Sequence, residues 1–297
     1  MIHLLYDSDS ELNLTIAQEY GIAGDEHHIK MPYIIQNKTY PCELITEESS
    51  NAFFDLVKAG NMPSTAALNP MEYVSILEPI FAKGDEILYV AFSSNMSGTF
   101  NNLRIALEEL TEKYPNTKFT RFDTLGISLS SGIFVLRAKE LLDEGKSVEE
   151  IVAELEDLKM RVNAYIIADD LMYLKKGGRL TAIKALLGTM LQLKPIIKLT
   201  TAGTLIPTTT VAGRNKALMT VINEVVEKVT DLDKYAIYVM NGACPQDRDR
   251  VVAKLQALLP EAKIIPQFIG PVIGSHCGPG TIAIIFVGPN RPEPIED

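Results

Sequence analysis

The stretch FSSNMSGTF, residues 92–100, joins a strand pattern to a helix pattern and so decides how the first half of the chain folds. The apolar run ILYVA, residues 87–91, precedes it and is typical of a buried strand. Apolar residues then recur at helical spacing over residues 101–113. We therefore predict a turn rich in hydroxyl groups between the end of a strand and the start of a helix.

Such a turn can bind a ligand or can simply start the helix. Open α/β sheets bind ligands at the carboxyl ends of their strands, where the next helix presents unpaired N–H groups and the positive end of its dipole. An anionic group held by hydroxyls and backbone amides would suit this place. Alternatively, Ser97 or Thr99 serves only as the helix cap. The turn alone favours the cap, and the rest of the chain has to decide between the two interpretations.

Length and composition indicate a globular protein of about two domains. The chain has 297 residues, of which 46% are hydrophobic and 22% charged. Its formal net charge of −10 argues against a general nucleic-acid surface or an anionic-membrane surface. No apolar stretch approaches the ~18 residues that a membrane span needs. We expect neither a nucleic-acid partner nor a membrane span.

The cysteines and the amino end indicate a cytoplasmic protein. The first acid appears at Asp7, too early for the apolar region of a signal peptide. Cys42, Cys244 and Cys277 are far apart and odd in number, which favours reduced thiols.

Strands and helices alternate in the first half of the chain. The predicted strands are residues 2–6, 27–36, 87–91 and 118–122, and the predicted helices are residues 46–58, a segment from 69–70 onward, 101–113, 130–144 and 147–161. This alternation predicts an α/β fold with a doubly wound, mostly parallel sheet in a domain spanning residues 1–161.

The second half, residues 162–297, is predicted to be an α+β domain. It combines strands at 164–168, 235–240, 263–268 and 281–287, a hairpin over 196–211, and helices at 182–193, 216–229 and 248–259. The Gly- and Pro-rich segment 269–280 is predicted to be a loop, and the tail 289–297 to be loose.

The sequence lacks the motifs of several common nucleotide-binding and metal-binding sites. Neither GxxxxGK[ST] nor GxGxxG after a strand occurs, and the four histidines lack the spacing of a helical metal pair. The acids in DSDSEL, residues 7–12, are better explained as a helix N-cap with first-turn carboxylates than as a metal site. We therefore predict no metal and no cofactor.

Two basic or nucleophilic clusters have a plain and a functional interpretation. Cys277 next to His276 is a poor catalytic pair because adjacent side chains usually point apart, so we expect a buried, unreactive thiol. His276 is either a structural histidine or a site residue. Lys175, Lys176 and Arg179 are by default a solvated helix end, where cations are favourable.

Taken together, these segments resemble the DegV family of bacterial fatty-acid-binding proteins, over nearly the whole chain and in the family's order. The segments are DSDSEL at 7–12, STAAL at 64–68, SSNMSGTF at 93–100, LMYLKKGGRL at 171–180 and IGSHCGPG at 273–280. The last three are long and specific. The second departs from the family's TSQPS-like loop, because Ala66 and Ala67 replace Gln and Pro, and the choice between Ser64 and Thr65 as the inward hydroxyl stays open.

The resemblance implies a long-chain fatty acid in a tunnel between the two domains, with its carboxylate held in the interdomain cleft. It implies head-group contacts from Ser64, Thr65, Ser97, Gly98, Arg179 and His276. Candidate tunnel walls, which could equally be ordinary core, are Ile183, Leu186, Leu187, Met190 and Leu191.

For the activity, the resemblance implies a binding subunit without catalytic residues of its own. In many family members the bound acid is presented to an ATP-dependent fatty acid kinase subunit, which makes acyl phosphate for phospholipid synthesis. Two alternatives stay open: a phosphoryl or acyl transferase in its own right, and a lipid sensor without a kinase.

Overall fold

The computed structural model describes residues 1–179 and 193–294, which group into two compact units. The first unit comprises Met1–Thr46 and Thr65–Asp157, and the second comprises Glu47–Ser64 and Leu158–Asp297. The segment Glu47–Ser64 thus belongs to the second unit, although it lies in the first half of the sequence. The division into domains at residue 161 stays a prediction.

Two expectations fall on residues outside the described ranges. The helix predicted over 182–193 lies there except for its last residue, Leu193, which begins a strand. The five candidate tunnel residues also lie there: Ile183, Leu186, Leu187, Met190 and Leu191.

The first unit contains the predicted parallel sheet. Its strands are β1 (Ile2–Asp7), β2 (His28–Ile29), β3 (Pro32–Ile35), β4 (Lys38–Pro41), β6 (Glu86–Ala91) and β7 (Phe119–Asp123). Its helices are η1 (Ser8–Ser10), α1 (Leu14–Glu19), α3 (Pro70–Phe81), α4 (Thr99–Lys113), α5 (Leu129–Asp143) and most of α6 (Val148–Lys159). Four strands pair in the order β2-β1-β6-β7, all parallel, which confirms the predicted sheet.

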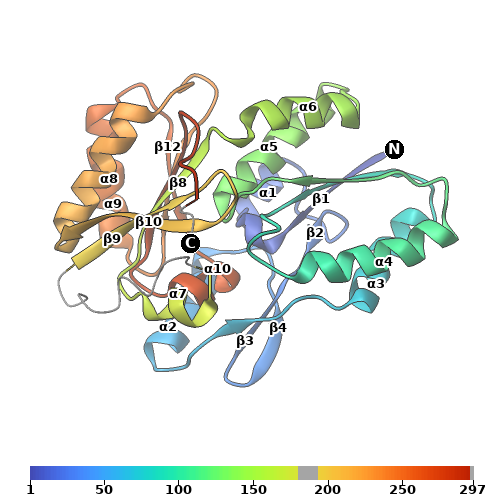
Figure 1. The fold of residues 1–297 in the computed structure, drawn as a ribbon, viewed down its shortest axis with the longest axis horizontal. Helices are drawn as coiled ribbons and strands as arrows, with labels where there is room; N and C mark the ends of the chain where they lie inside the picture. Colours follow the sequence, from blue (N-terminus) through green and yellow to red (C-terminus); the bar gives the residue numbers. More distant parts are fainter. Residues whose placement is uncertain (180–192, 295–297) are drawn as a thin grey trace. The chain divides into compact units, whose positions relative to one another are not determined.

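The four-stranded sheet is covered on both faces, as a doubly wound fold requires. In Figure 1, α3 and α4 lie on one side of it and α5 and α6 on the other. All residues of β6 from Ile87 to Ala91 are fully buried, which explains their unbroken apolar pattern. Helix α5 packs against η1 so closely that a Cβ at Gly132 would lie 2.6 Å from the carbonyl oxygen of Ser10. Only glycine permits that approach.

The segment predicted as one strand, residues 27–36, is divided between two sheets. β2 belongs to the parallel sheet, whereas β3 pairs with β4 and with the short β5 (Ser64–Thr65) in a separate three-stranded sheet. Lys30 and Met31 separate the two strands, and β3 begins at Pro32, which cannot donate a ladder hydrogen bond, so the break has a local cause.

The second unit is built on a mixed six-stranded sheet. Its strands are β8 (Val162–Ile167), β9 (Leu193–Leu199), β10 (Leu205–Ala212), β11 (Ile237–Asn241), β12 (Ile264–Phe268) and β13 (Ile282–Val287), in the order β10-β9-β8-β13-β11-β12. Its helices are α2 (Glu47–Lys58), α7 (Met172–Gly177), α8 (Arg214–Lys228), α9 (Pro245–Leu258) and α10 (Pro271–Cys277). Only the β11–β12 pair is parallel among these neighbours, which confirms the predicted α+β character.

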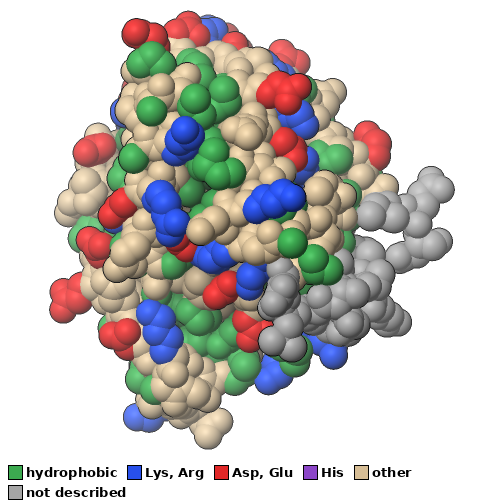
Figure 2. All heavy atoms as spheres, turned by 90° about the vertical axis from the view of Figure 1, so that its left-hand side faces the viewer, with side chains coloured by type: hydrophobic (Ala, Val, Ile, Leu, Met, Phe, Trp, Pro, Cys, Tyr) green, Lys and Arg blue, Asp and Glu red, His purple; other side chains and the backbone are tan. Residues whose placement is uncertain are grey.

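Helices α8 and α9 cover one face of the mixed sheet and enclose its core. The buried cluster joins Val221 and Val225 of α8 and Leu255 of α9 to strand residues such as Ile196 and Ile284. On the side of the molecule shown in Figure 2, charged side chains of both signs are interspersed with small apolar patches.

Two predictions for the carboxyl-terminal part were wrong. Residues 271–277, predicted as part of a loop, form α10, which starts with Pro271 at its first turn and ends before Gly278. The tail 289–297, predicted to be loose, is held in place through Glu293, because Arg291 is buried and its Nε donates to the carbonyl oxygen of Val162 over 2.6 Å. The Thr201 hydroxyl also donates a hydrogen bond to Glu293 Oε2 in the tail. Residues 295–297 of the tail lie outside the described residues.

In the part of the chain that the structure describes, none of the helices is both long and apolar enough to cross a membrane.

Candidate functional site

The hydroxyl-rich turn forms as predicted between β6 and α4 in the first unit. Helix α4 starts after Gly98, a residue without a side chain to cap it. Instead, Ser97 Oγ accepts the backbone N–H of Thr99 over 3.2 Å, so Ser97 does support the helix entry. A hydroxyl has one proton and two lone pairs, so Ser97 can also donate to an anion. The two interpretations of the turn are therefore compatible.

The base of this turn is fixed by neighbouring strand ends. The Ser93 N–H donates to the carbonyl oxygen of Gly126 over 2.8 Å, and the Ser94 N–H donates to Asp123 Oδ1 over 3.3 Å. Ser93 is buried, Ser97 is half-buried and Gly98 is exposed. The turn thus rises from a buried, hydrogen-bonded base to an accessible tip.

Ser64 and Thr65 lie on a strand rather than in a loop. They form β5, next to β3, and the following Ala66 N–H donates to the carbonyl oxygen of Pro32 over 3.2 Å. Successive residues of a strand point to opposite faces, so the two hydroxyls face opposite sides of this small sheet. Ser64 is exposed and Thr65 is half-buried.

In the second unit, the structure brings together the segments that carry Arg179 and His276. The backbone of Gly177, in the last turn of α7, lies against the imidazole of His276 on α10, where a Cβ would come within 3.0 Å of Nδ1. Burial, with a smaller contribution from the positive charge of Arg179, lowers the pKa of His276 to about 4. The imidazole is therefore neutral at pH 7.

Arg179 follows directly after the end of α7. Its guanidinium donates to the carbonyl oxygen of Gly177, the same residue whose backbone touches His276. Lys175 and Lys176 are exposed in the last turn of the helix, and Gly178 ends it with a φ of 66°. This confirms that the two lysines lie at a solvated helix end, while Arg179 is half-buried beside the histidine segment.

Aromatic residues that were not among the predicted site residues pack around α10. A Cβ at Gly274 would lie 2.8 Å from Phe53 and 2.9 Å from Phe54, both on α2. A Cβ at Gly278, whose φ is 73°, would come within 3.0 Å of the ring of Tyr173 on α7. The glycine spacing around His276 was the available signal, since glycine often marks a close approach of other groups to the backbone.

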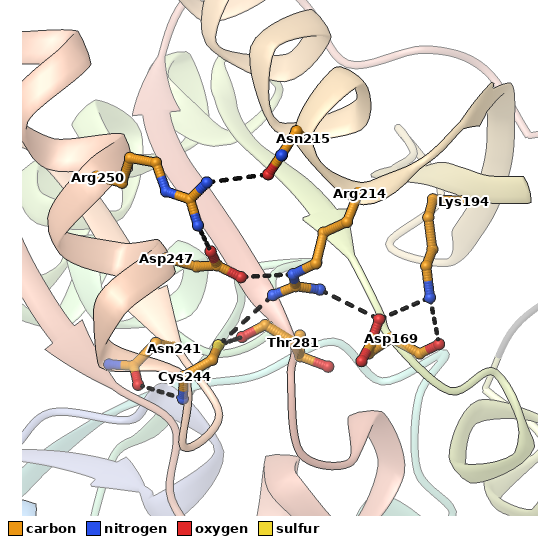
Figure 3. Close-up of polar contacts among 9 residues, drawn as sticks. All are labelled: Asp169, Lys194, Arg214, Asn215, Asn241, Cys244, Asp247, Arg250 and Thr281. Atoms are coloured by element: carbon orange, nitrogen blue, oxygen red, sulfur yellow. Dashed lines mark hydrogen bonds and ion pairs between the residues drawn. The ribbon is translucent and has the colours of Figure 1, made fainter. Parts of the chain in front are cut away.

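A polar network supports this region at the ends of β8 and β11 (Figure 3). Asp169 accepts from Lys194 over 2.6 Å and from Arg214 over 3.5 Å, and Arg214 Nε also donates to Asp247 Oδ2 over 2.5 Å. A Cβ at Gly280 would lie 2.7 Å from Asp169 Cβ. The network therefore holds both the segment leading into α7 and the loop leaving α10.

The remaining titratable candidates have structural roles. Asp7 caps η1, as predicted, by accepting the N–H of Asp9 over 3.1 Å. Cys277 is buried, as predicted, and burial raises the pKa of the Cys244 thiol to about 11. Within residues 1–179 and 193–294, no group of three or more His, Cys, Asp or Glu side chains is arranged to hold a metal ion.

Comparison with known sequences places these features in one family. The family model described as "Uncharacterised protein, DegV family" matches residues 1–288. A DegV domain-containing protein of Clostridium perfringens is 34% identical over 285 residues, which cover 96% of this chain and 97% of the relative.

Solved structures of DegV family proteins are also similar to this chain. The crystal structure described as that of DegV, a fatty acid binding protein from Bacillus subtilis, is 26% identical with a TM-score of 0.80, covering 97% of this chain and 99% of that chain. A structure described as fatty acid binding of a DegV family protein from Thermus thermophilus is 27% identical with a TM-score of 0.78, at the same coverage of both chains. The chain belongs to the DegV family.

Proposed function

We propose that this protein binds one long-chain fatty acid and holds its carboxylate with hydroxyl groups and with the His276–Arg179 pair. The observation that carries the proposal is that the relatives from Bacillus subtilis and Thermus thermophilus, matched over 97% of this chain, are described as binding fatty acids.

The chemistry of the second unit suits a carboxylate. A neutral imidazole can donate one N–H to a carboxylate oxygen, and the nearby guanidinium of Arg179 supplies the positive charge that a partly buried anion needs. Once the carboxylate is bound, its negative charge would favour the protonated imidazole and so raise the pKa of His276.

From the first unit, we propose that Ser97 donates its hydroxyl proton and that the exposed backbone at Gly98 lets the head group approach closely. Ser64 and Thr65 are neighbours on β5 and face opposite sides of the small sheet, so only one of the two hydroxyls can reach the head group. The carboxylate would thus receive several donors, and a single lost donor would weaken the site without abolishing it.

The apolar chain would supply most of the affinity. Burying ~16 carbons at about 0.8 kcal/mol per methylene gives a gross gain on the order of 12 kcal/mol. Desolvating the carboxylate costs several kcal/mol unless hydrogen bonds replace its water. The head-group residues therefore offset that cost and set the position of the reactive end.

We further propose that the protein presents the acid to an ATP-dependent kinase subunit, which phosphorylates the carboxylate, and that it has no catalytic residues of its own. The sequence lacks the phosphate-binding signatures of nucleotide enzymes, which supports a partner that brings nucleotide and magnesium. The acyl or phosphoryl transferase and the kinase-free lipid sensor are the competing functions.

Native mass spectrometry tests the binding. Protein purified from a bacterial host should carry one fatty acid per chain, released by organic extraction. Empty protein that also rejects added fatty acid would contradict the proposal. For the partner, acyl phosphate should form only when protein, fatty acid, magnesium-ATP and the kinase subunit are combined. Turnover without the kinase would favour the transferase alternative.

A further inference from the structure

The carboxylate of Asp7 is fully buried at the end of β1 and is surrounded by donors. The Tyr89 hydroxyl donates to Oδ2 over 2.7 Å, the Phe92 N–H donates to the same oxygen over 3.3 Å, and the Asp9 N–H donates to Oδ1 over 3.1 Å. All three partners donate, which suits an ionised carboxylate. Burial opposes ionisation and raises the pKa of Asp7 to about 7, whereas the hydrogen bonds act in the opposite direction.

These contacts connect Asp7 to the turn that carries Ser97. β1 and β6 are parallel neighbours, so the carboxylate at the end of β1 reaches Phe92, the first residue after β6. At the other end of the turn, Thr99 Oγ1 lies 2.8 Å from the hydroxyl of the buried Tyr73. The entry and the exit of the turn are therefore both held by buried polar side chains, with Ser97 between them.

We propose that Asp7 is a positioning residue: by holding the backbone of Phe92, it sets the direction of the Ser97 hydroxyl and hence the selectivity for a carboxylate head group. A carboxylate offers two acceptor oxygens, so it can satisfy Phe92 and Asp9 at once. A neutral isostere cannot, because asparagine has one acceptor oxygen. The effect on the ligand rests on the proposed function, whereas the effect on the turn does not.

Amide hydrogen exchange of the ligand-free protein tests the effect on the turn. In Asp7→Asn, the amide oxygen should stay with the backbone N–H groups of Asp9 and Ser10, because the Tyr89 hydroxyl can turn and accept from the NH₂ group. The Phe92 N–H then loses its acceptor. We expect a peptide covering residues 92–99 to exchange about tenfold faster, as for the loss of one hydrogen bond to a charged group. The control is Glu11→Gln, because Glu11 is also buried, at 2% exposure, but accepts from Ser128 at the start of α5.

Glu11→Gln should leave the exchange of residues 92–99 unchanged. Unaltered exchange of this peptide in Asp7→Asn, or the same acceleration in both variants, would overturn the proposal. Tyr89→Phe is the second variant, should Asp7→Asn not fold. It removes one donor that orients Oδ2 toward Phe92, so it should accelerate the same peptide to a smaller extent. No acceleration in that variant would also contradict the proposal.

Ligand selectivity tests the second part of the proposal, which is that Asp7 sets the preference for a carboxylate head group. Wild-type protein should prefer a fatty acid to the primary alcohol of equal chain length. Asp7→Asn should lose affinity for the acid on the order of tenfold while keeping its affinity for the alcohol. An equal loss for both ligands would indicate a general structural effect and would refute the positioning role. If the wild type itself showed no preference for the acid, the proposed function would fail, whereas the exchange experiment would still decide the role of Asp7.

Discussion

The imidazole of His276 lies directly against the backbone of Gly177, so position 177 accommodates no side chain while the ring stays in place. The two residues are far apart in the sequence and come from different helices, α7 and α10. This contact makes the position of the histidine depend on a glycine.

Gly177→Ala should therefore displace His276 and destabilise the protein by about 1–3 kcal/mol, the usual cost of overpacking. In a His276→Ala background the same substitution should cost much less, because the ring that clashes is gone. Denaturant unfolding of the wild type, both single variants and the double variant measures this coupling. Additive effects would show that Gly177 is not constrained by the ring.

The pH dependence of stability should report the buried state of His276. Its pKa falls from 6.5 unfolded to about 4 folded, so the folded state resists protonation. Stability contributed by the neutral ring is complete above pH 6.5, is lost as the pH falls toward 4 and changes no further below it. The full effect is about 3 kcal/mol.

His276→Asn should flatten this part of the stability curve. His28 also has a pKa lowered to about 4 by burial, so His28→Asn serves as a comparison that removes a similar contribution from the other unit. NMR titration of the two histidines should further separate them, because only His276 should titrate at higher pH once a fatty acid is bound. An unchanged His276 titration would argue against a head group at this ring.

Ser97→Ala and His276→Ala should leave the fold intact and weaken the head-group end of the site. A hydrogen bond to a charged group is typically worth about 1.5–3 kcal/mol, whereas the apolar chain supplies most of the affinity. Acyl phosphate formation should thus suffer more than lipid binding. Calorimetry and a coupled kinase assay measure the two effects. Thr220→Ala, which removes a hydroxyl that donates to the carbonyl oxygen of Lys216 within α8, is the control.

Lys175 and Lys176 are exposed at the end of α7, and we expect them to steer a partner protein. Reversal of both to Glu should slow association with the kinase subunit and weaken its dependence on salt, because exposed charges act mainly on the encounter rate. The matched control reverses two exposed lysines elsewhere, Lys216 and Lys254. Association rates that respond equally to both double variants would indicate a general charge effect.

Hydrophobic periodicity was sufficient where an element is buried in a regular way. The strand at 87–91 and the helix that follows it were predicted because β6 is buried on both faces and α4 on one. Prediction from periodicity was wrong where local loop-forming residues lie in a segment that is helical in the tertiary structure. The segment around Gly274 contains loop-forming residues, yet it is helical and its glycine packs against Phe53 and Phe54 of α2.

The sequence by itself determined the parallel sheet of the first unit, the α+β character of the second and the hydroxyl-rich turn, since each follows from periodicity and turn residues within a short stretch. Its longest segments also indicated the DegV family. The assignment of a fatty acid to Ser97, Arg179 and His276 stays a prediction that rests on the family's motifs.

Only the tertiary structure decided how distant polar groups meet. The bond from Phe92 to Asp7 and the contact of Gly177 with His276 join residues that are far apart along the chain. Such contacts depend on which strands become neighbours and on how closely two helices pack, and no local pattern encodes either. Burial then sets the chemistry, since it raises the pKa of Asp7 and lowers that of His276 by removing water from each group.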